Sequence, residues 1–396
     1  MGQPIKKKIQ EIHSDIIKEE PFYTLLVDGN GVLFHSMADT TVNSSGIHVG
    51  GIFQFLLQLR MMLSKKDFDY VYVTFDDEFS GWLRWKLYKP YKSNRDKHYE
   101  DYGVSEYMKE YNANLKRMQK YLFNKNKKKT DVAKSKTSWE VFIDANFDRE
   151  RDTLIKYFEE LFIRNIMDDV VEGDDFIAYY CKHKKENEKI IIMTGDMDLS
   201  QLLADDIALY DMHTKKFITN KNFSDYFGYY YENTMIKKVF CGDASDNIGN
   251  IKGLSEEGFK KLMPEFLTKK ITIDDVQKRA QDLIDDRVKN KKKPLQVHEN
   301  IIKGISNKTY DGNFYDINKK IIDLSCPLLT DEAENLIESM MYAPQDPEGR
   351  SFQNLYSYIL EDGIDELTGD TKFATFFSPF KRLFDKETKR FNETKI

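Results

Sequence analysis

The chain has 396 residues, of which 40% are hydrophobic and 13% aromatic, which is enough to bury a sizeable core and excludes a disordered chain. Its three cysteines, Cys181, Cys241 and Cys326, share no CxxC spacing, which argues against a disulfide scaffold or cysteine zinc site and favours a reducing, cytoplasmic setting. The net charge of −6 conceals a basic stretch, because residues 84–136 hold 16 Lys and Arg against 6 Asp and Glu, which suits a polyanion partner or a solvated loop.

Strand and helix signals alternate through the first half of the chain. Polar residues 1–20 predict an N-terminal arm. Short apolar runs predict strands at 22–27, 70–75, 169–171, 189–194 and 206–210, and amphipathic patterns predict helices at 50–63, 147–163 and 172–183. This alternation predicts an α/β fold with a mainly parallel central sheet flanked by helices on both faces. No apolar run has the length of a membrane span, so we expect no membrane association.

The pattern becomes helical after about residue 230. We therefore expect four regions: the arm at 1–20, a core at 21–240 with a basic insertion at about 84–138, a helical domain at 241–369, and a tail at 370–396.

Carboxylates follow four predicted strands in succession. They are Asp28 after the first strand, Asp76 after the second, Glu172, Asp174 and Asp175 after the third, and Asp196 and Asp198 after the fourth. Parallel strands bring their carboxyl ends to one edge of a sheet, so these side chains should converge there. Such a cluster needs cations, and oxygen ligands without His or Cys select Mg²⁺ or Mn²⁺. Each acid alone could instead serve a turn or a helix dipole.

Two more acids, Asp243 and Asp246, stand three residues apart in the segment GDASDN at 242–247. Glycines at 249 and 253 follow, and their spacing predicts a tight turn whose N–H groups could face a phosphate. A predicted helix at 256–263 would complete a helix–turn–helix. An ordinary helix–helix connection is the simpler interpretation of this segment alone.

Five stretches taken together resemble the flap endonuclease/5′–3′ exonuclease family. They are LLVDGN (25–30), TFDDEFSGWLRWKLYKPYKSNR (74–95), VEGDDFIA (171–178), TGDMDLSQLL (194–203) and GDASDNIGNIKGL (242–254), in the family order. SGWLRWKLYKPYKSNR (80–95) and NKKIIDLSCPLL (318–329) are most similar to the ribonuclease H branch found in T-even bacteriophages.

The resemblance implies a helical arch, a C-terminal helical domain with a DNA-binding helix–turn–helix, and two Mg²⁺ ions for which Mn²⁺ can substitute. The first metal site would comprise Asp28, Asp76, Glu172, Asp174 and Asp175, and the second Asp196, Asp198, Asp243 and Asp246. Lys92 and Arg95 match catalytic basic residues above the scissile phosphate, and Tyr91 matches a residue that stacks on a base. The implied nucleic-acid-binding residues are Arg84, Lys86, Lys89, Tyr91, Lys92, Arg95, Gly249, Lys252 and Gly253. Ser255 replaces the second glycine of the family's turn.

The resemblance also implies the activity, which is that of a Mg²⁺-dependent 5′-nuclease of DNA replication with exonuclease, flap endonuclease and RNase H-type activity. Its partners would be DNA and RNA–DNA duplexes with 5′ ends or flaps, and a single-strand binding protein. The enzyme would act as a monomer in the cytoplasm, that of a host cell if a phage encodes it. The alternatives are a catalytically silent DNA-binding module on the same fold and a PIN-like ribonuclease.

The tail places Phe373, Phe376 and Phe377 on one face of a helical turn that Pro379 ends. This pattern resembles the peptides with which replication enzymes dock on a sliding clamp, and that reading requires Phe376 and Phe377 to be exposed in the free protein. The alternative is that the tail packs on the fold as a capping segment.

Overall fold

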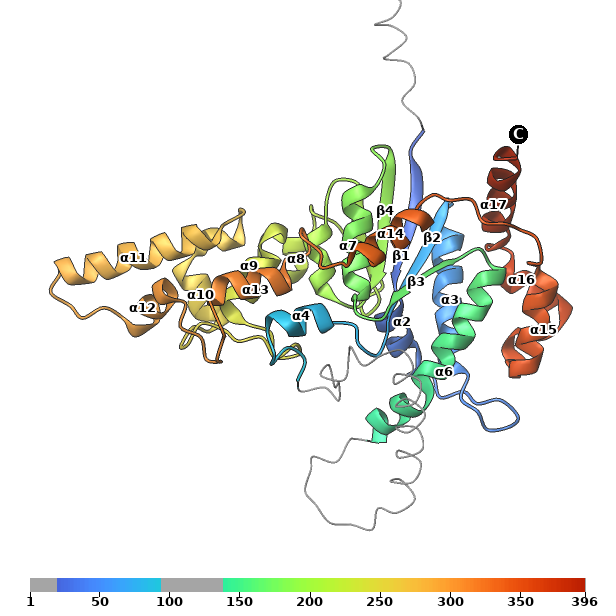
Figure 1. The fold of residues 1–396 in the computed structure, drawn as a ribbon, viewed down its shortest axis with the longest axis horizontal. Helices are drawn as coiled ribbons and strands as arrows, with labels where there is room; N and C mark the ends of the chain where they lie inside the picture. Colours follow the sequence, from blue (N-terminus) through green and yellow to red (C-terminus); the bar gives the residue numbers. More distant parts are fainter. Residues whose placement is uncertain (1–19, 94–137, 396) are drawn as a thin grey trace, which may run out of the picture.

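The computed structural model describes residues 20–93 and 138–395. Its centre is a six-stranded sheet in the order β3-β2-β1-β4-β5-β6 (Figure 1). The strands are β1 (Phe22–Asp28), β2 (Tyr70–Asp76), β3 (Arg164–Asp168), β4 (Glu188–Thr194), β5 (Ile207–Asp211) and β6 (Lys216–Ile218). Every pair is parallel except β5 with β6, so the predicted mainly parallel α/β fold is confirmed.

The third predicted strand, at 169–171, is wrong, because β3 ends before it at Asp168. Residues 169–171 form a turn in which one carboxylate oxygen of Asp168 accepts the N–H groups of Val170 and Val171 at 2.9 and 3.2 Å. The two valines resemble a strand in sequence, but the Asp168 side chain caps the turn. The short antiparallel β6 was not predicted.

Consecutive apolar residues of the inner strands face opposite layers. Leu25 and Val27 of β1 belong to one hydrophobic cluster, whereas Leu26 belongs to the other. The alternation follows from the two-residue period of a strand, and burial on both faces explains why β1 and β2 are continuously apolar. The helices of this part are α2 (Gly29–Ser36), α3 (Gly50–Lys65), α4 (Trp82–Leu87), α6 (Ser138–Glu160) and α7 (Gly173–His183).

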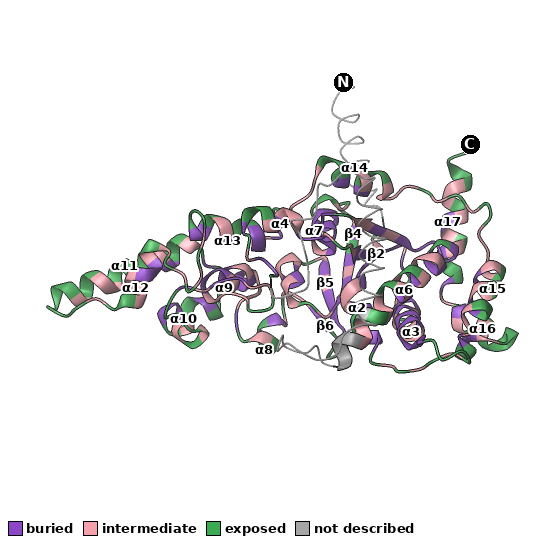
Figure 2. Ribbon diagram, turned by 60° about the horizontal axis from the view of Figure 1, so that its bottom comes forward, coloured by how far each residue is buried: buried purple, intermediate pink, exposed green. Residues whose placement is uncertain are grey.

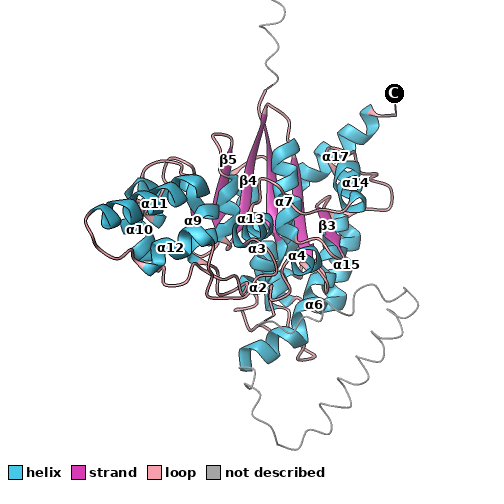
Figure 3. Ribbon diagram, turned by 60° about the vertical axis from the view of Figure 1, so that its left-hand side comes forward, coloured by secondary structure: helices cyan, strands magenta, loops and turns pink. Residues whose placement is uncertain are grey.

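A helical region extends from the β5–β6 side of the sheet along the long axis of the molecule (Figures 1 and 3). It contains α8 (Phe223–Phe227), α9 (Thr234–Cys241), α10 (Glu256–Leu262), α11 (Ile273–Lys289), α12 (Gln296–Lys303) and α13 (Phe314–Ile322), with short 3₁₀ turns at Tyr231–Asn233 and Pro264–Leu267. The 3₁₀ turn Met197–Leu202 follows β4, and α14 (Asp331–Met340) lies beside β3. The predicted helix–turn–helix is present as α9 and α10. Its apolar residues continue the cluster that includes α7.

The last helices return to the sheet on the side of α3 and α6. They are α15 (Phe352–Asp362), α16 (Asp370–Phe377) and α17 (Lys381–Glu393), with a 3₁₀ turn at Asp365–Leu367. They share a hydrophobic cluster with α3 and α6, so the region predicted as one helical domain at 241–369 divides between the two sides of the sheet.

The tail belongs to the fold. Phe377 is only 2% exposed, and Phe380 and Leu383 are also buried in the core. Figure 2 shows α15, α16 and α17 on the same side of the molecule as α3 and α6. Glu387 of α17 forms a buried ion pair with Arg164 of β3, with 2.8 Å between nitrogen and oxygen. Phe377 therefore lacks the exposure that a clamp-docking peptide requires. The tail instead packs on the fold, as the capping alternative predicts.

The helical arch predicted in the basic insertion lies outside the described residues, as do Arg95 and the N-terminal arm before Glu20. Across the described ranges, no helix combines the length and apolar character needed to cross a bilayer.

Candidate active site

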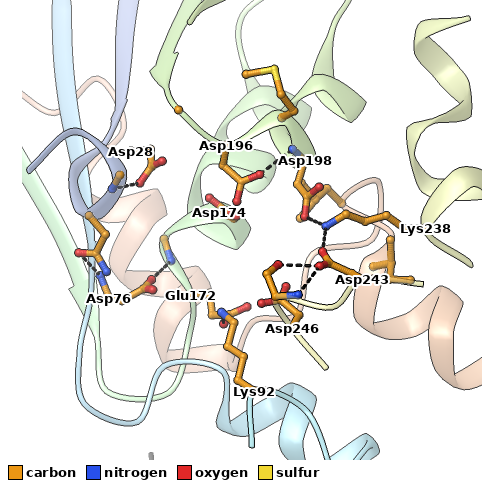
Figure 4. A pocket seen from close by; sticks show the side chains of 18 of the residues that line it. Asp28, Asp76, Lys92, Glu172, Asp174, Asp196, Asp198, Lys238, Asp243 and Asp246 are labelled. Carbon is orange, nitrogen blue, oxygen red and sulfur yellow. Dashed lines mark hydrogen bonds and ion pairs between the residues drawn. The ribbon is translucent and has the colours of Figure 1, made fainter. Parts of the chain in front are cut away.

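The strand-end carboxylates converge on a cavity of about 1290 Å³ at the C-terminal edge of the sheet. Figure 4 shows them pointing toward one another from β1, β2, α7 and the loops after β4 and α9. Eight predicted ligands line it: Asp28, Asp76, Glu172, Asp174, Asp196, Asp198, Asp243 and Asp246. The convergence expected from parallel strands is confirmed.

Asp28 both ends β1 and caps α2. Its Oδ1 accepts the N–H of Gly31 at 2.9 Å, and its Oδ2 accepts the hydroxyl of Thr194 at 2.8 Å. A Cβ at position 31 would lie 2.3 Å from Asp28 Oδ2, so only glycine allows this close approach. The DGN turn thereby fixes the Asp28 carboxylate at the C-terminal end of β1.

Asp76 ends β2 and accepts the N–H of Gly173 at 2.8 Å, which brings the first turn of α7 against the strand. A Cβ at Gly173 would lie 2.9 Å from the Thr74 hydroxyl, so glycine permits this packing. Glu172 precedes α7 in extended backbone, and Asp174 follows within its first turn. Both side chains therefore face the cavity.

The remaining acids form a second group beside α9. Oxygens of Asp198, Asp243 and Asp246 all lie within 4.8 Å of one another. The ammonium of Lys238, on α9, forms ion pairs with both Asp198 and Asp243. Among the described residues this is a compact set of three acids around one cation.

Burial and mutual repulsion raise the pKa values of these carboxylates. Burial, with the negative charges of Asp196 and Asp76, raises the pKa of Asp28 to about 6. Burial and the charges of Asp196 and Asp28 likewise raise the pKa of Asp174 well above its ordinary value. Without counter-cations the cluster therefore resists full ionisation.

The second group is partly neutralised by Lys238. Burial raises the pKa of Asp198 to about 7 despite that ammonium. Burial is the largest influence on Asp243 too, yet its ion pair with Lys238 and its hydrogen bonds to Ser245 lower its pKa to about 2. The two carboxylates differ because burial prevails at Asp198, where the charges of Asp196 and Asp243 add to it, whereas the hydrogen bonds of Ser245 help to offset burial at Asp243.

The donor set fits hard divalent cations. Eight carboxylates without cysteine provide the oxygen ligands that Mg²⁺ and Mn²⁺ prefer, and bound cations would relieve the repulsion that raises the pKa values of Asp28 and Asp174.

Lys92 lies at the wall of the cavity. It is buried, and its ammonium pairs with Glu172. Burial alone would lower the pKa of Lys92, but the charges of Glu172 and Asp246 raise it well above the ordinary value. The ammonium therefore stays charged beside the carboxylates.

Two predicted site residues, Asp175 and Arg84, form an ion pair inside the protein. The Asp175 carboxylate is 0% exposed, binds the Arg84 guanidinium through Nη1 and Nη2 (2.9 Å), and accepts the N–H of Leu328. Arg84 Nη1 also pairs with Glu172 at 2.8 Å. Neighbouring positions on a helix point in different directions, so Asp175 faces the interior while Asp174 faces the cavity. Asp175 thus lies outside the set of carboxylates that line the cavity, whereas Arg84 lines it and pairs with Glu172.

Tyr91 lies at the wall of the cavity, and its stacking on a base stays a prediction. Its side chain is 2% exposed, and its hydroxyl donates to Glu172 at 3.0 Å. Gly249 is buried, and its N–H donates to the Tyr310 hydroxyl at 2.9 Å instead of facing a phosphate.

Four other predicted nucleic-acid contacts lie on the surface. Lys86 and Lys89 are exposed, with their ammonium groups 4.4 and 3.1 Å from the ring centroids of Trp82 and Trp85. Lys252 and Gly253 are exposed at the turn between α9 and α10, where Gly253 has a φ of +84°. These positions are compatible with contact to a large ligand.

Sequence reasoning missed Lys238 and the pair His35 and His213. The two imidazoles line the cavity with ring centroids 5.3 Å apart, and they come from α2 and the turn after β5. A lysine on an amphipathic helix gives no sequence signal of its own, and the two histidines are 178 positions apart in the chain.

Comparison with known proteins identifies the fold and family. The family described as 5′-3′ exonuclease, N-terminal resolvase-like domain matches residues 23–133 and 142–228. A 5′-3′ exonuclease of Mycoplasmopsis pulmonis is 28% identical over 141 residues, covering 33% of this chain and 48% of that protein. One from Bacillus subtilis is 32% identical over 113 residues, covering 28% of this chain and 38% of that protein. The alignments thus span less than half of these relatives.

Solved structures of bacteriophage T5 D15 share the fold. A crystal structure of T5 D15 with metal ions has a TM-score of 0.55 at 16% identity, covering 81% of this chain and 98% of that one. A D15 flap endonuclease variant in a pseudo-enzyme–product complex with DNA and metal ions has a TM-score of 0.53 at 13% identity, covering 92% and 99%. With the family domain matched over half of its length, the chain belongs to the 5′-3′ exonuclease N-terminal, resolvase-like domain family.

Proposed function

We propose that this protein is a Mg²⁺-dependent 5′-nuclease of DNA replication. It hydrolyses phosphodiester bonds near the 5′ ends of duplex or flapped nucleic acid, including the RNA of RNA–DNA duplexes. The observation that carries the proposal is the cavity lined by eight carboxylates, with the charged Lys92 ammonium at its wall.

Two groups of carboxylates would hold the cations. Asp28, Asp76, Glu172 and Asp174 form one group, and Asp196, Asp198, Asp243 and Asp246 form the other. When bound, a pair of Mg²⁺ ions neutralises charge on the phosphodiester and lowers the pKa of an attacking water. Mn²⁺ has the same preference for carboxylate oxygen and would substitute.

The chain's own residues bind and orient the substrate. Lys92 places a positive charge where negative charge develops on the transferring phosphate, a role worth most in a site shielded from water. Exposed Lys86, Lys89 and Lys252 would contact phosphates of the duplex. Arg95 would join Lys92 as a second catalytic cation; this part of the proposal rests on the sequence alone.

A labelled 5′-flap duplex tests the proposal directly, with a matched RNA–DNA duplex beside it. We expect Mg²⁺-dependent release of 5′ fragments, its loss in EDTA and its restoration by Mn²⁺. Binding of the duplex without cleavage in either metal would indicate a silent DNA-binding protein. Cleavage of single-stranded RNA alone would indicate a PIN-like ribonuclease.

A further inference from the structure

Asn247 occupies the loop that carries two of the metal-site acids. The loop is closed by paired backbone hydrogen bonds between Asp243 and Ile248, at 3.1 and 2.7 Å. Asn247 has a left-handed φ of +61°, a conformation that asparagine tolerates better than most residues. The turn aims its side chain away from the carboxylates and toward the segment that leads into the basic insertion.

The Asn247 amide joins this loop to that segment. Its Nδ2 donates to the carbonyl of Pro90 at 2.7 Å and to the hydroxyl of Ser93 at 2.8 Å. In the same place the backbone N–H of Lys92 donates to the carbonyl of Asp246 at 3.0 Å. Residues 90–93 therefore wrap around Asn247 and are attached to it at both ends.

The other side of the amide reaches the helical region. Asn247 Oδ1 accepts from the Lys308 ammonium. The backbone N–H of Lys308 donates to the Ser306 hydroxyl at 3.2 Å, and that hydroxyl donates to the carbonyl of Asn250 in the helix–turn–helix at 2.8 Å. Three of the four hydrogen-bonding positions of the amide therefore connect to other segments, both donor positions and one acceptor position.

Lys92 needs such support, because its own backbone is left-handed, with a φ of +49°. This conformation is unfavourable for lysine and persists where surrounding contacts impose it. Its side chain turns into the cavity beside Glu172 (Figure 4). The contacts of Asn247 with Pro90 and Ser93 flank that residue on both sides.

We propose that Asn247 is a positioning residue, which acts through Lys92. It fixes residues 90–93 to the loop of Asp243 and Asp246. The position of the Lys92 ammonium relative to the second group of carboxylates is thereby kept constant. The inference rests on the proposed nuclease function, since the group that Lys92 would act on is the scissile phosphate.

The test uses the full-length protein and single-turnover cleavage of a 5′-flap duplex at saturating enzyme. N247G removes the side chain while allowing the left-handed backbone. It therefore tests the loss of the side-chain hydrogen bonds without a change in the turn. N247D keeps an acceptor for Lys308 but loses the donor to Pro90. We expect both to lower the rate by about 10-fold to 100-fold, with flap affinity in Ca²⁺ within about twofold of wild type. N220A, at a half-buried asparagine whose amide donates to Asp205, is the control and should match wild type.

A double-mutant cycle with K92A separates positioning from a general structural role. If Asn247 acts through Lys92, N247G should slow K92A by less than about twofold. Full additivity of the two losses, or an unchanged rate in N247G, would overturn the inference. A drop in flap affinity without a change in the saturated rate would also overturn it. Failure of the wild-type protein to cleave any 5′ substrate would instead reject the proposed function.

Discussion

The Lys238 ammonium lies between the carboxylates of Asp198 and Asp243 and pairs with both. Burial opposes a charged lysine, but the two carboxylates raise its pKa above the ordinary value. Without cations, Lys238 thus supplies part of the positive charge that this half of the cavity requires. We expect a bound cation and Lys238 to compete for the same carboxylate oxygens.

K238M should therefore lower the stability of the metal-free protein and increase the stabilisation that added metal provides. In EDTA its melting temperature should fall, because two partly buried carboxylates lose their counter-charge. Added Mn²⁺ should then raise the melting temperature by more than it does in wild type. K237M is the control, since the neighbouring Lys237 pairs with Glu256 instead of the strand-end carboxylates, with 3.2 Å between nitrogen and oxygen. Equal responses of K238M and K237M to Mn²⁺ would contradict the competition.

Asp174 and Asp175 should behave differently despite their adjacency. D174N should lower cleavage by roughly two orders of magnitude or more, because a metal ligand contributes several kcal/mol to charge stabilisation. D175N should instead lower the melting temperature, since it removes the counter-charge of the buried Arg84, while cleavage per folded molecule stays within a few-fold of wild type. Single-turnover rates and thermal melts measure both effects. If D175N abolished cleavage without destabilisation, Asp175 would be a ligand after all.

The stability of the metal-free protein should fall as pH rises. Folding raises the pKa of Asp28 to about 6, above the ordinary value near 3.9. A raised pKa means that the stabilising contribution is complete below about pH 4 and is lost as pH rises through about 6. In EDTA, D28N should lose less stability than wild type between pH 4 and 7. Parallel melting curves for the two proteins across this range would contradict the repulsion described for the cavity.

The C-terminal tail should be required for stability and not for chemistry. F380A removes a fully buried ring and should cost about 3–5 kcal/mol of unfolding free energy. F376A, at a half-buried ring in the same segment, should cost less. Chemical denaturation measures both, and cleavage per folded molecule should be unchanged. Loss of the 370–396 segment without a stability change would restore the docking-peptide interpretation.

The catalytic edge of the fold could be predicted from the sequence because its signals are local. Each strand is a short apolar run, and a carboxylate stands at or just beyond its end, as Asp28 and Asp76 do. Parallel pairing then brings these ends together whatever the details of packing. The strand prediction was wrong at residues 169–171. The two valines there are apolar like those of a strand, but the Asp168 side chain caps a turn at this point.

The missed features depend on contacts between distant segments. Arg84 and Tyr91 look like surface groups in a basic stretch, yet both are buried, and the pairing of Arg84 with Asp175 spans 91 positions. The amphipathic pattern of α16 and α17 predicts an apolar face but does not specify the partner, which is the cluster around α3 and α6. Lys238 acquires its role only when α9 is placed beside the loop after β4.

Anomalous diffraction from crystals soaked in Mn²⁺ would test the central claim most directly. Two peaks are predicted in the cavity, one among Asp28, Asp76, Glu172 and Asp174, and one among Asp196, Asp198, Asp243 and Asp246. The Lys238 ammonium should move away from the second peak. Peaks elsewhere on the protein, or a cavity without manganese in crystals of protein that cleaves a flap in Mn²⁺, would contradict the account.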